Sequence, residues 1–130
     1  MDEAASIEES YHNSYYYFIR AVKILSESPE KQCELVGDYN VAWELKDEVS
    51  SGIYLIESPA STLNASQKLA IQQLIDELNK MPATVLREAT NHKINLKAMQ
   101  NPVWVPLRKQ AAILQRTLEA ATKNNERYFS

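Results

Sequence analysis

Two histidines and one cysteine carry much of the metal-ligating and nucleophilic chemistry available to this chain of 130 residues. Glu9 and His12 have the Glu-x-x-His spacing that places two metal ligands on one helix face in di-iron bundles. Such a centre needs a second pair and two further glutamates, but His92 follows Glu88 by four residues rather than three. We therefore expect no metal and no other cofactor, and we expect His12 at the polar edge of its helix near Tyr16.

The segment from Arg87 to His92 has a spacing that could support acid–base chemistry on RNA. It resembles the Arg-x4-His motif of HEPN ribonucleases, which implies that the histidine would move a proton and the arginine would bind a phosphate. Glu88 departs from that pattern, because it would place a negative charge beside the phosphate. An arginine and a histidine also suit the C-terminal end of a helix, where the helix dipole favours cations. We expect this second role.

Composition narrows the classes of protein further. Gly37 and Gly52 are the only glycines, which is too few for a phosphate-binding loop and disfavours β-hairpins. Cys33 is the single cysteine, and we expect a small buried side chain in a reducing compartment. The apolar runs are shorter than the roughly 20 residues that cross a bilayer, and the acidic first three residues are unlike a signal peptide. We therefore expect a cytoplasmic protein with no membrane partner.

Charge is divided unevenly along the chain. Residues 1–65 hold twelve acidic and four basic residues, a net charge of −8, whereas residues 66–130 hold five acidic and ten basic residues, a net charge of +5. The acidic half would repel nucleic acid, so we expect no nucleic-acid partner. It would suit a basic protein partner, although an ordinary dipolar charge distribution explains it equally well.

Apolar residues recur at spacings of three and four along most of the chain, the pattern of amphipathic helices. We expect an all-α fold, a single-domain bundle of five to six helices with short loops over residues 1–130. Residues of N-cap type precede several of the helices, and Gly37 ends the second. The expected helices span about 7–26, 29–37, 41–56, 65–80, 83–92 and 102–123. Residues 93–101 are expected to be less regular, with one helical turn around Leu96 and Met99.

The expected helix over 41–56 has two contrasting sides. At about 100° per residue, its valines, leucine and isoleucines fall on one side, and Gly52 lies near that side, where another helix could approach closely. Trp43, Asp47 and Tyr54 fall on the opposite side, flanked by glutamates. If exposed, they would form a protein-binding hot spot. We expect instead that this helix is central and that Trp43 and Tyr54 are buried beneath the first or the last helix.

Two stretches resemble a family of small all-helical bacterial immunity proteins, the partners of contact-delivered and other polymorphic toxins. The first reads Gly-Asp-Tyr-Asn-Val-Ala-Trp-Glu-Leu-Lys-Asp-Glu-Val over residues 37–49, and the second reads Asn-Pro-Val-Trp-Val-Pro-Leu-Arg over residues 101–108. The resemblance implies a protein that binds a cognate toxin domain and blocks it inside the producing cell. It identifies neither the toxin nor the residues in contact with it.

We therefore expect an immunity protein, with no catalysis of its own, that occludes the basic substrate site of a toxin, most simply a nuclease. Its carboxylates would mimic phosphates and speed the encounter, while aromatic side chains would anchor the complex. The alternatives are a HEPN-like ribonuclease that uses Arg87 and His92, and a helical adaptor protein. The expected partner-binding residues are Glu34, Asp38, Glu44, Asp47, Glu48 and Tyr16.

Overall fold

The computed structural model describes residues 3–37, 39–87 and 91–130, and the regular elements within them are all α-helices. The helices are α1 (Glu3–Leu25), α2 (Pro29–Val36), α3 (Val41–Ser50), α4 (Gly52–Glu57), α5 (Ala65–Asn79), α6 (Ala83–Arg87), α7 (His92–Met99), α8 (Trp104–Thr117) and α9 (Glu119–Phe129). The all-α expectation is confirmed. The expected number of helices is wrong, because the described residues alone hold more than six.

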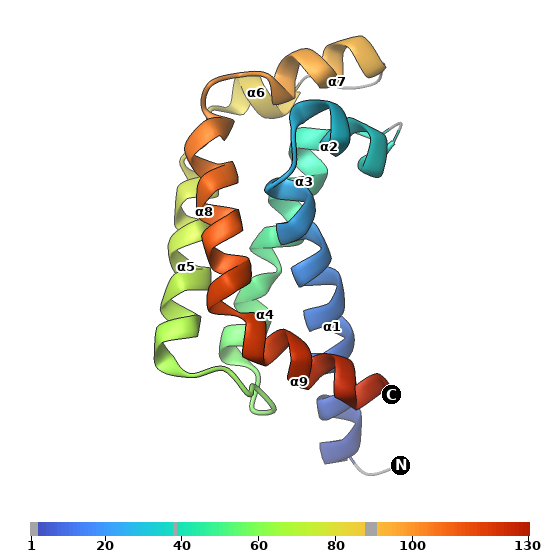
Figure 1. The fold of residues 1–130 in the computed structure, drawn as a ribbon, viewed down its shortest axis with the longest axis vertical. Coiled ribbons are helices and arrows are strands. Elements are labelled where there is room, and N and C mark those ends of the chain that lie inside the picture. The colour runs from blue at the N-terminus through green and yellow to red at the C-terminus, as the bar shows by residue number, and fades with distance from the viewer. Residues whose placement is uncertain (1–2, 38, 88–90) are drawn as a thin grey trace.

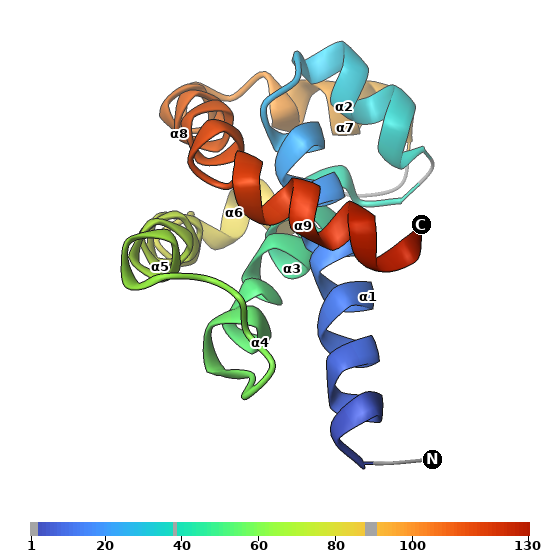
Figure 2. The same ribbon diagram turned by 60° about the horizontal axis from the view of Figure 1, so that its bottom comes forward.

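Four long segments form the body of the bundle and alternate in direction (Figure 1). α1 is followed by α3 and α4, which together run back along it, then by α5 and finally by α8. α5 and α8 lie side by side and antiparallel, and the Gln67 side chain donates a 3.4 Å hydrogen bond to the Thr117 carbonyl. α2, α6 and α7 cover one end of the bundle, and α9 crosses α1 at the other (Figure 2).

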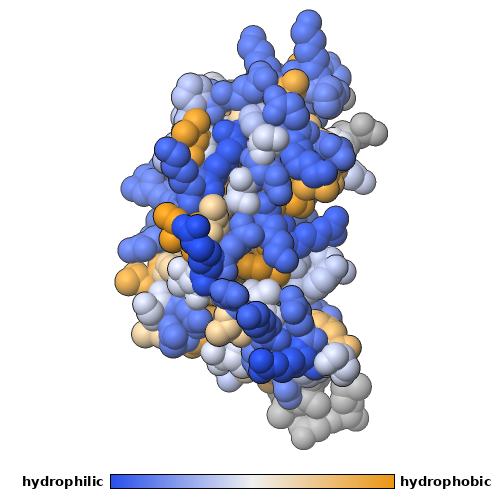
Figure 3. Space-filling model, viewed as in Figure 1, coloured by the Kyte–Doolittle hydropathy of each residue, from blue (hydrophilic) through white to orange (hydrophobic). Residues whose placement is uncertain are grey.

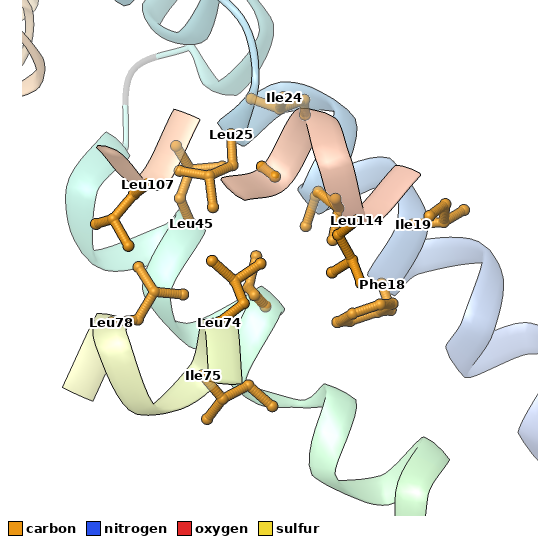
Figure 4. Packing of buried hydrophobic residues seen from close by; sticks show 14 of the residues in the cluster. Phe18, Ile19, Ile24, Leu25, Leu45, Leu74, Ile75, Leu78, Leu107 and Leu114 are labelled. Carbon is orange, nitrogen blue, oxygen red and sulfur yellow. The ribbon is translucent and has the colours of Figure 1, made fainter. Parts of the chain in front are cut away.

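These segments bury one shared apolar core. Figure 4 shows side chains from α1, α3, α5 and α8 pointing into the same interior, among them Leu45 and Leu74. Both are fully buried, and burial of a leucine side chain contributes about 1.5–3 kcal/mol. Cys33 is also buried in this core, as its isolation in the sequence indicated.

The helix starts follow the predicted caps. Ser28 accepts from the Lys31 amide ahead of α2, and Asn40 accepts from the Trp43 amide ahead of α3. Asn64 forms a full capping box with Gln67 at the start of α5. Each cap satisfies an amide that has no partner within its helix, which fixes where the helix begins. Gly37 ends α2 with a φ of 83°, a backbone conformation that glycine adopts without strain.

The expected helix over 41–56 is divided at Ser51. The Ser51 hydroxyl donates to the Glu48 carbonyl, a local bond that competes with the helical ladder. After the break, a different side of the helix faces the core. As a result, Leu55 is fully buried, whereas Ile53 and Ile56 are only partly buried. Gly52 follows the break and confirms the expected close approach, since an added Cβ would lie 2.6 Å from Phe18 Cε1.

The expected last helix is divided at Leu118. The Leu118 side chain is fully buried, and its carbonyl accepts a 3.4 Å hydrogen bond from the Tyr15 hydroxyl on α1. This division turns α9 across α1, and α9 continues to Phe129, beyond the expected end near Lys123.

The sequence pattern was least accurate where helices are short or lie at the edge of the bundle. The expected single turn around Leu96 and Met99 belongs to a longer helix, because residues 93–99 form most of α7 and Asn91 caps it by accepting from the Ile94 amide. The described part of α6 is Ala83–Arg87, and the extended Asn91 caps α7, so the expected single helix from 83 to His92 is wrong. On α5, Leu69 is exposed although it is a large apolar residue.

Among the residues that the structure describes, no helix is both long enough and apolar enough to cross a membrane.

Candidate protein-interaction surface

α3 is held to the bundle through its first residues. The Asn95 side chain on α7 is buried, accepts from the Val41 amide at 3.2 Å and donates to the Tyr39 carbonyl at 2.9 Å. Asn40 caps α3 and donates to the Leu86 carbonyl at 2.7 Å. These bonds fix the start and the rotation of α3, and therefore the side that it presents to solvent.

Trp43 lies on that outward side, and a second large exposed aromatic residue, Tyr54, follows on α4. Trp43 is 49% exposed and Tyr54, on α4, is 41% exposed. The expectation that both are buried beneath another helix is therefore wrong. α3 does pack against α1, α5 and α7, but it does so through Val41, Ala42, Leu45 and Val49, and its opposite side is left uncovered. Exposed tryptophan and tyrosine side chains are the residue types that most often anchor protein interfaces.

Three carboxylates lie on the same helix. Partial burial of Glu48, together with the negative charges of Glu44 and Asp47, raises the pKa of Glu48, and the positive charge of Arg20 on α1 opposes this rise. The three side chains form no ion pair within 4 Å among the described residues. The negative charges of Glu44 and Asp47 disfavour the ionised form of Glu48, and a basic partner would favour it. We call Trp43, Glu44, Asp47, Glu48 and Tyr54 the α3 face.

Two of the remaining expected contact residues, Glu34 and Tyr16, lie on other helices than α3 and α4. Glu34 lies on α2 and forms an exposed ion pair with Lys31, with 3.4 Å between Nζ and Oε1. Tyr16 lies on α1 and lines a hollow shared with α9. Asp38 lies outside the described residues. Of the six residues expected from the sequence, three therefore group together.

The residues of the ribonuclease alternative are only partly described. α6 ends at Arg87, and His92 is an exposed residue that begins α7. Residues 88–90 lie outside the described part of the chain, and so does the side chain of Arg87. The expected position of both residues at the C-terminal end of one helix is wrong for His92, which stands at a helix start.

The Glu9–His12 pair does not form a ligand pair in this fold. His12 is 5% exposed rather than at a polar edge, because α9 covers it. Its Nδ1 lies 2.6 Å from Asn125 Oδ1, and its ring stacks on Tyr128 with 3.9 Å between the ring centroids. The nearer acid is Glu8, whose Oε1 lies 4.0 Å from Nε2. His12 therefore serves to attach α9 to α1.

Of a second group of exposed aromatic residues, only Tyr16 was expected from the sequence to contact a partner. Tyr16 and Tyr17 on α1 and Phe129 on α9 are 52%, 60% and 51% exposed, and they border one hollow. The contribution of Phe129 could not be predicted, since it depends on the path of α9 after Leu118.

The face formed by α8 and α9 presents a different surface (Figure 3). It is largely hydrophilic, and its apolar residues form small separate patches. Scattered apolar residues of this kind are normal on a protein surface and do not indicate an interface. The α3 face is the better candidate, because it combines exposed aromatic side chains with uncompensated charge.

Comparison of the chain with models of protein families, with curated proteins and with solved structures yields no match, so the candidate surface is interpreted from its own geometry.

Proposed function

We propose that this protein is an immunity protein that binds a basic toxin domain through the α3 face and blocks its substrate site. The observation that carries the proposal is the grouping of Glu44, Asp47 and Glu48 beside an exposed Trp43, with no ion pair to neutralise them among the described residues. The family resemblance of residues 37–49 supports it, because that segment contains Trp43 and all three acids.

The proposed action is occlusion, without a reaction of its own. Clustered carboxylates resemble the phosphates of a nucleic acid, so the α3 face would compete for the basic cleft of a nuclease toxin. Charge attraction would speed the encounter, and burial of Trp43 and Tyr54 would slow dissociation. The protein would act in the cytoplasm of the bacterium that makes the toxin, as protection in contact-dependent growth inhibition requires.

Co-expression with the product of the adjacent reading frame tests this function. If that product is toxic, the wild-type chain should restore growth and form a complex with it. Reversal of charge at Glu44, Asp47 and Glu48 to lysine should abolish protection and slow association by roughly tenfold or more at low ionic strength. The association rate of the wild-type pair should fall as salt is added.

A charge-matched control distinguishes the effect of changing the α3 face from the effect of changing the net charge of the protein. Lysine at Glu27, Asp76 and Glu119, three exposed acids on other parts of the surface, changes the net charge by the same amount. We expect this variant to retain protection. Equal loss in both triple variants would show that the position of the acids does not matter. Cells that survive the neighbouring product without this chain would exclude the immunity function.

A further inference from the structure

α9 is fixed on α1 in a way that leaves one of its sides free to form a site. Asn125 and Tyr128, three residues apart, attach the helix to His12. Glu126 and Phe129, also three residues apart, occupy the neighbouring strip of the helix and remain exposed. The helix backbone that carries both side chains is therefore fixed before a partner binds, which lowers the entropic cost of binding.

A hollow with a volume of about 400 Å³ lies between this strip and α1. It is lined by Asn13, Tyr16, Tyr17, Glu126 and Phe129. Tyr16 and Tyr17 meet edge to face, with 5.2 Å between their ring centroids and an interplanar angle of 84°. Three aromatic rings that are each about half exposed around one hollow are uncommon on the surface of a monomer.

The chemistry of the lining selects a cation. Aromatic faces carry a negative quadrupole, and guanidinium and ammonium groups bind over them. Glu126 adds a full negative charge, and its carboxylate forms no ion pair within 4 Å among the described residues. Asn13 adds a side-chain carbonyl that can accept a hydrogen bond. No lysine or arginine lines this hollow, and Arg20 and Lys23 line the adjoining hollow, which shares Tyr16 and Glu126 with it.

We propose that this hollow, the α1–α9 hollow, binds an arginine side chain of a protein partner. The guanidinium plane would stack on the aromatic rings while its N–H groups donate to Glu126 and Asn13. The inference rests on the proposed function for the identity of the partner, a basic protein. It adds a specific anchor at a position separate from the acids of α3.

A small probe tests the hollow without any toxin. N-acetyl-arginine methylamide is titrated into the full chain and followed by NMR, with the citrulline analogue as a neutral match and the lysine and trimethyllysine analogues as other cations. The arginine probe should shift the ring signals of Tyr16, Tyr17 and Phe129. It should bind about fivefold or more tightly than the citrulline analogue. Equal binding of the two, or shifts that map elsewhere, would overturn the cation site, and tighter binding of a lysine analogue would overturn the assignment to arginine.

Two variants and a control sharpen the result. Glu126→Gln removes the charge with little change of shape and should weaken binding of the arginine probe about threefold. Phe129→Leu should weaken binding of the probe by a similar factor. Tyr39→Leu replaces an exposed tyrosine far from the hollow in sequence and should leave binding unchanged. Unchanged binding in both hollow variants would exclude the site. Since no toxin is present, this outcome is independent of the growth assay that tests the immunity function.

Discussion

Asn125 makes two hydrogen bonds to His12 across 113 positions of sequence. Its Oδ1 lies 2.6 Å from His12 Nδ1, and its Nδ2 donates to the His12 backbone carbonyl at 3.1 Å. Because a carboxamide oxygen can only accept, the ring proton of His12 resides on Nδ1. Both residues are buried, so this pair fixes the position and the rotation of α9 on α1.

Asn125→Ala should therefore destabilise the protein. The substitution leaves the His12 ring and carbonyl buried without partners, which costs about 1–3 kcal/mol. Urea unfolding monitored by circular dichroism measures the loss. Asn124→Ala removes the exposed neighbouring side chain and should change stability by no more than about 0.5 kcal/mol. Equal losses in the two variants would contradict a structural role for the pair.

Gly52→Ala should destabilise the contact between α1 and α4. The new Cβ would lie 2.6 Å from Phe18 Cε1 and 3.0 Å from Ile71 Cγ2, so the Phe18 ring must move, at a cost of about 1–3 kcal/mol. The double variant Phe18→Leu with Gly52→Ala should lose less stability than the sum of the two single variants, because a smaller side chain relieves the clash. Strict additivity would show that the two sites are independent.

Glu48→Gln should stabilise the protein at neutral pH. The folded-state pKa of Glu48 is raised, so its contribution to stability is fully present below the unfolded-state pKa, about 4.3, and is lost as pH rises through the folded-state pKa. The variant cannot ionise, and its gain at pH 7 should stay below about 1 kcal/mol, since the side chain is largely solvated. Thermal unfolding should show a higher Tm at pH 7 and no difference near pH 4. A gain that is the same at both pH values would exclude charge repulsion as its cause.

Tyr15→Phe should change how the free energy of unfolding depends on pH under alkaline conditions. Burial raises the pKa of Tyr15 to about 12, and its hydroxyl bonds to Thr122 Oγ1 at 2.7 Å. The unfolded chain loses this proton near pH 10 and the folded chain does not, so the stabilisation falls as pH rises from about 10 to 12. In the variant, the free energy of unfolding should not show this decrease. At pH 7 the variant should be less stable than the wild-type protein by about 0.5–1.5 kcal/mol. Urea unfolding of both proteins across this pH range measures the difference.

The fluorescence of the two tryptophans should show that one is buried and the other is exposed to solvent. Trp104 is fully buried, whereas Trp43 is 49% exposed. Trp43→Phe should therefore leave blue-shifted fluorescence that acrylamide quenches poorly, from Trp104 alone. The wild-type chain should show an additional red-shifted component that is quenched readily, and that component should become protected when a partner covers the α3 face. Poor quenching of the free wild-type protein would show that Trp43 is covered.

The sequence determined the local features of this protein. The caps at Ser28, Asn40 and Asn64 and the helix end at Gly37 depend on residues within a few positions of each other, and the structure has each of them. The class of the fold and most core positions follow from apolar periodicity for the same reason. The grouping of Glu44, Asp47 and Glu48 also follows from one helical segment, and this is why it could be predicted.

Tertiary structure alone decided which sides of the helices are covered. The sequence pattern cannot tell whether a helix lies at the centre of a bundle or at its edge, so the exposure of Trp43 and the burial of His12 were both predicted wrongly. The break at Leu118 depends on the bond from Tyr15 on α1 and on the crossing of α9 over α1. The α1–α9 hollow joins residues more than 100 positions apart in the chain, a contact that helical periodicity does not encode.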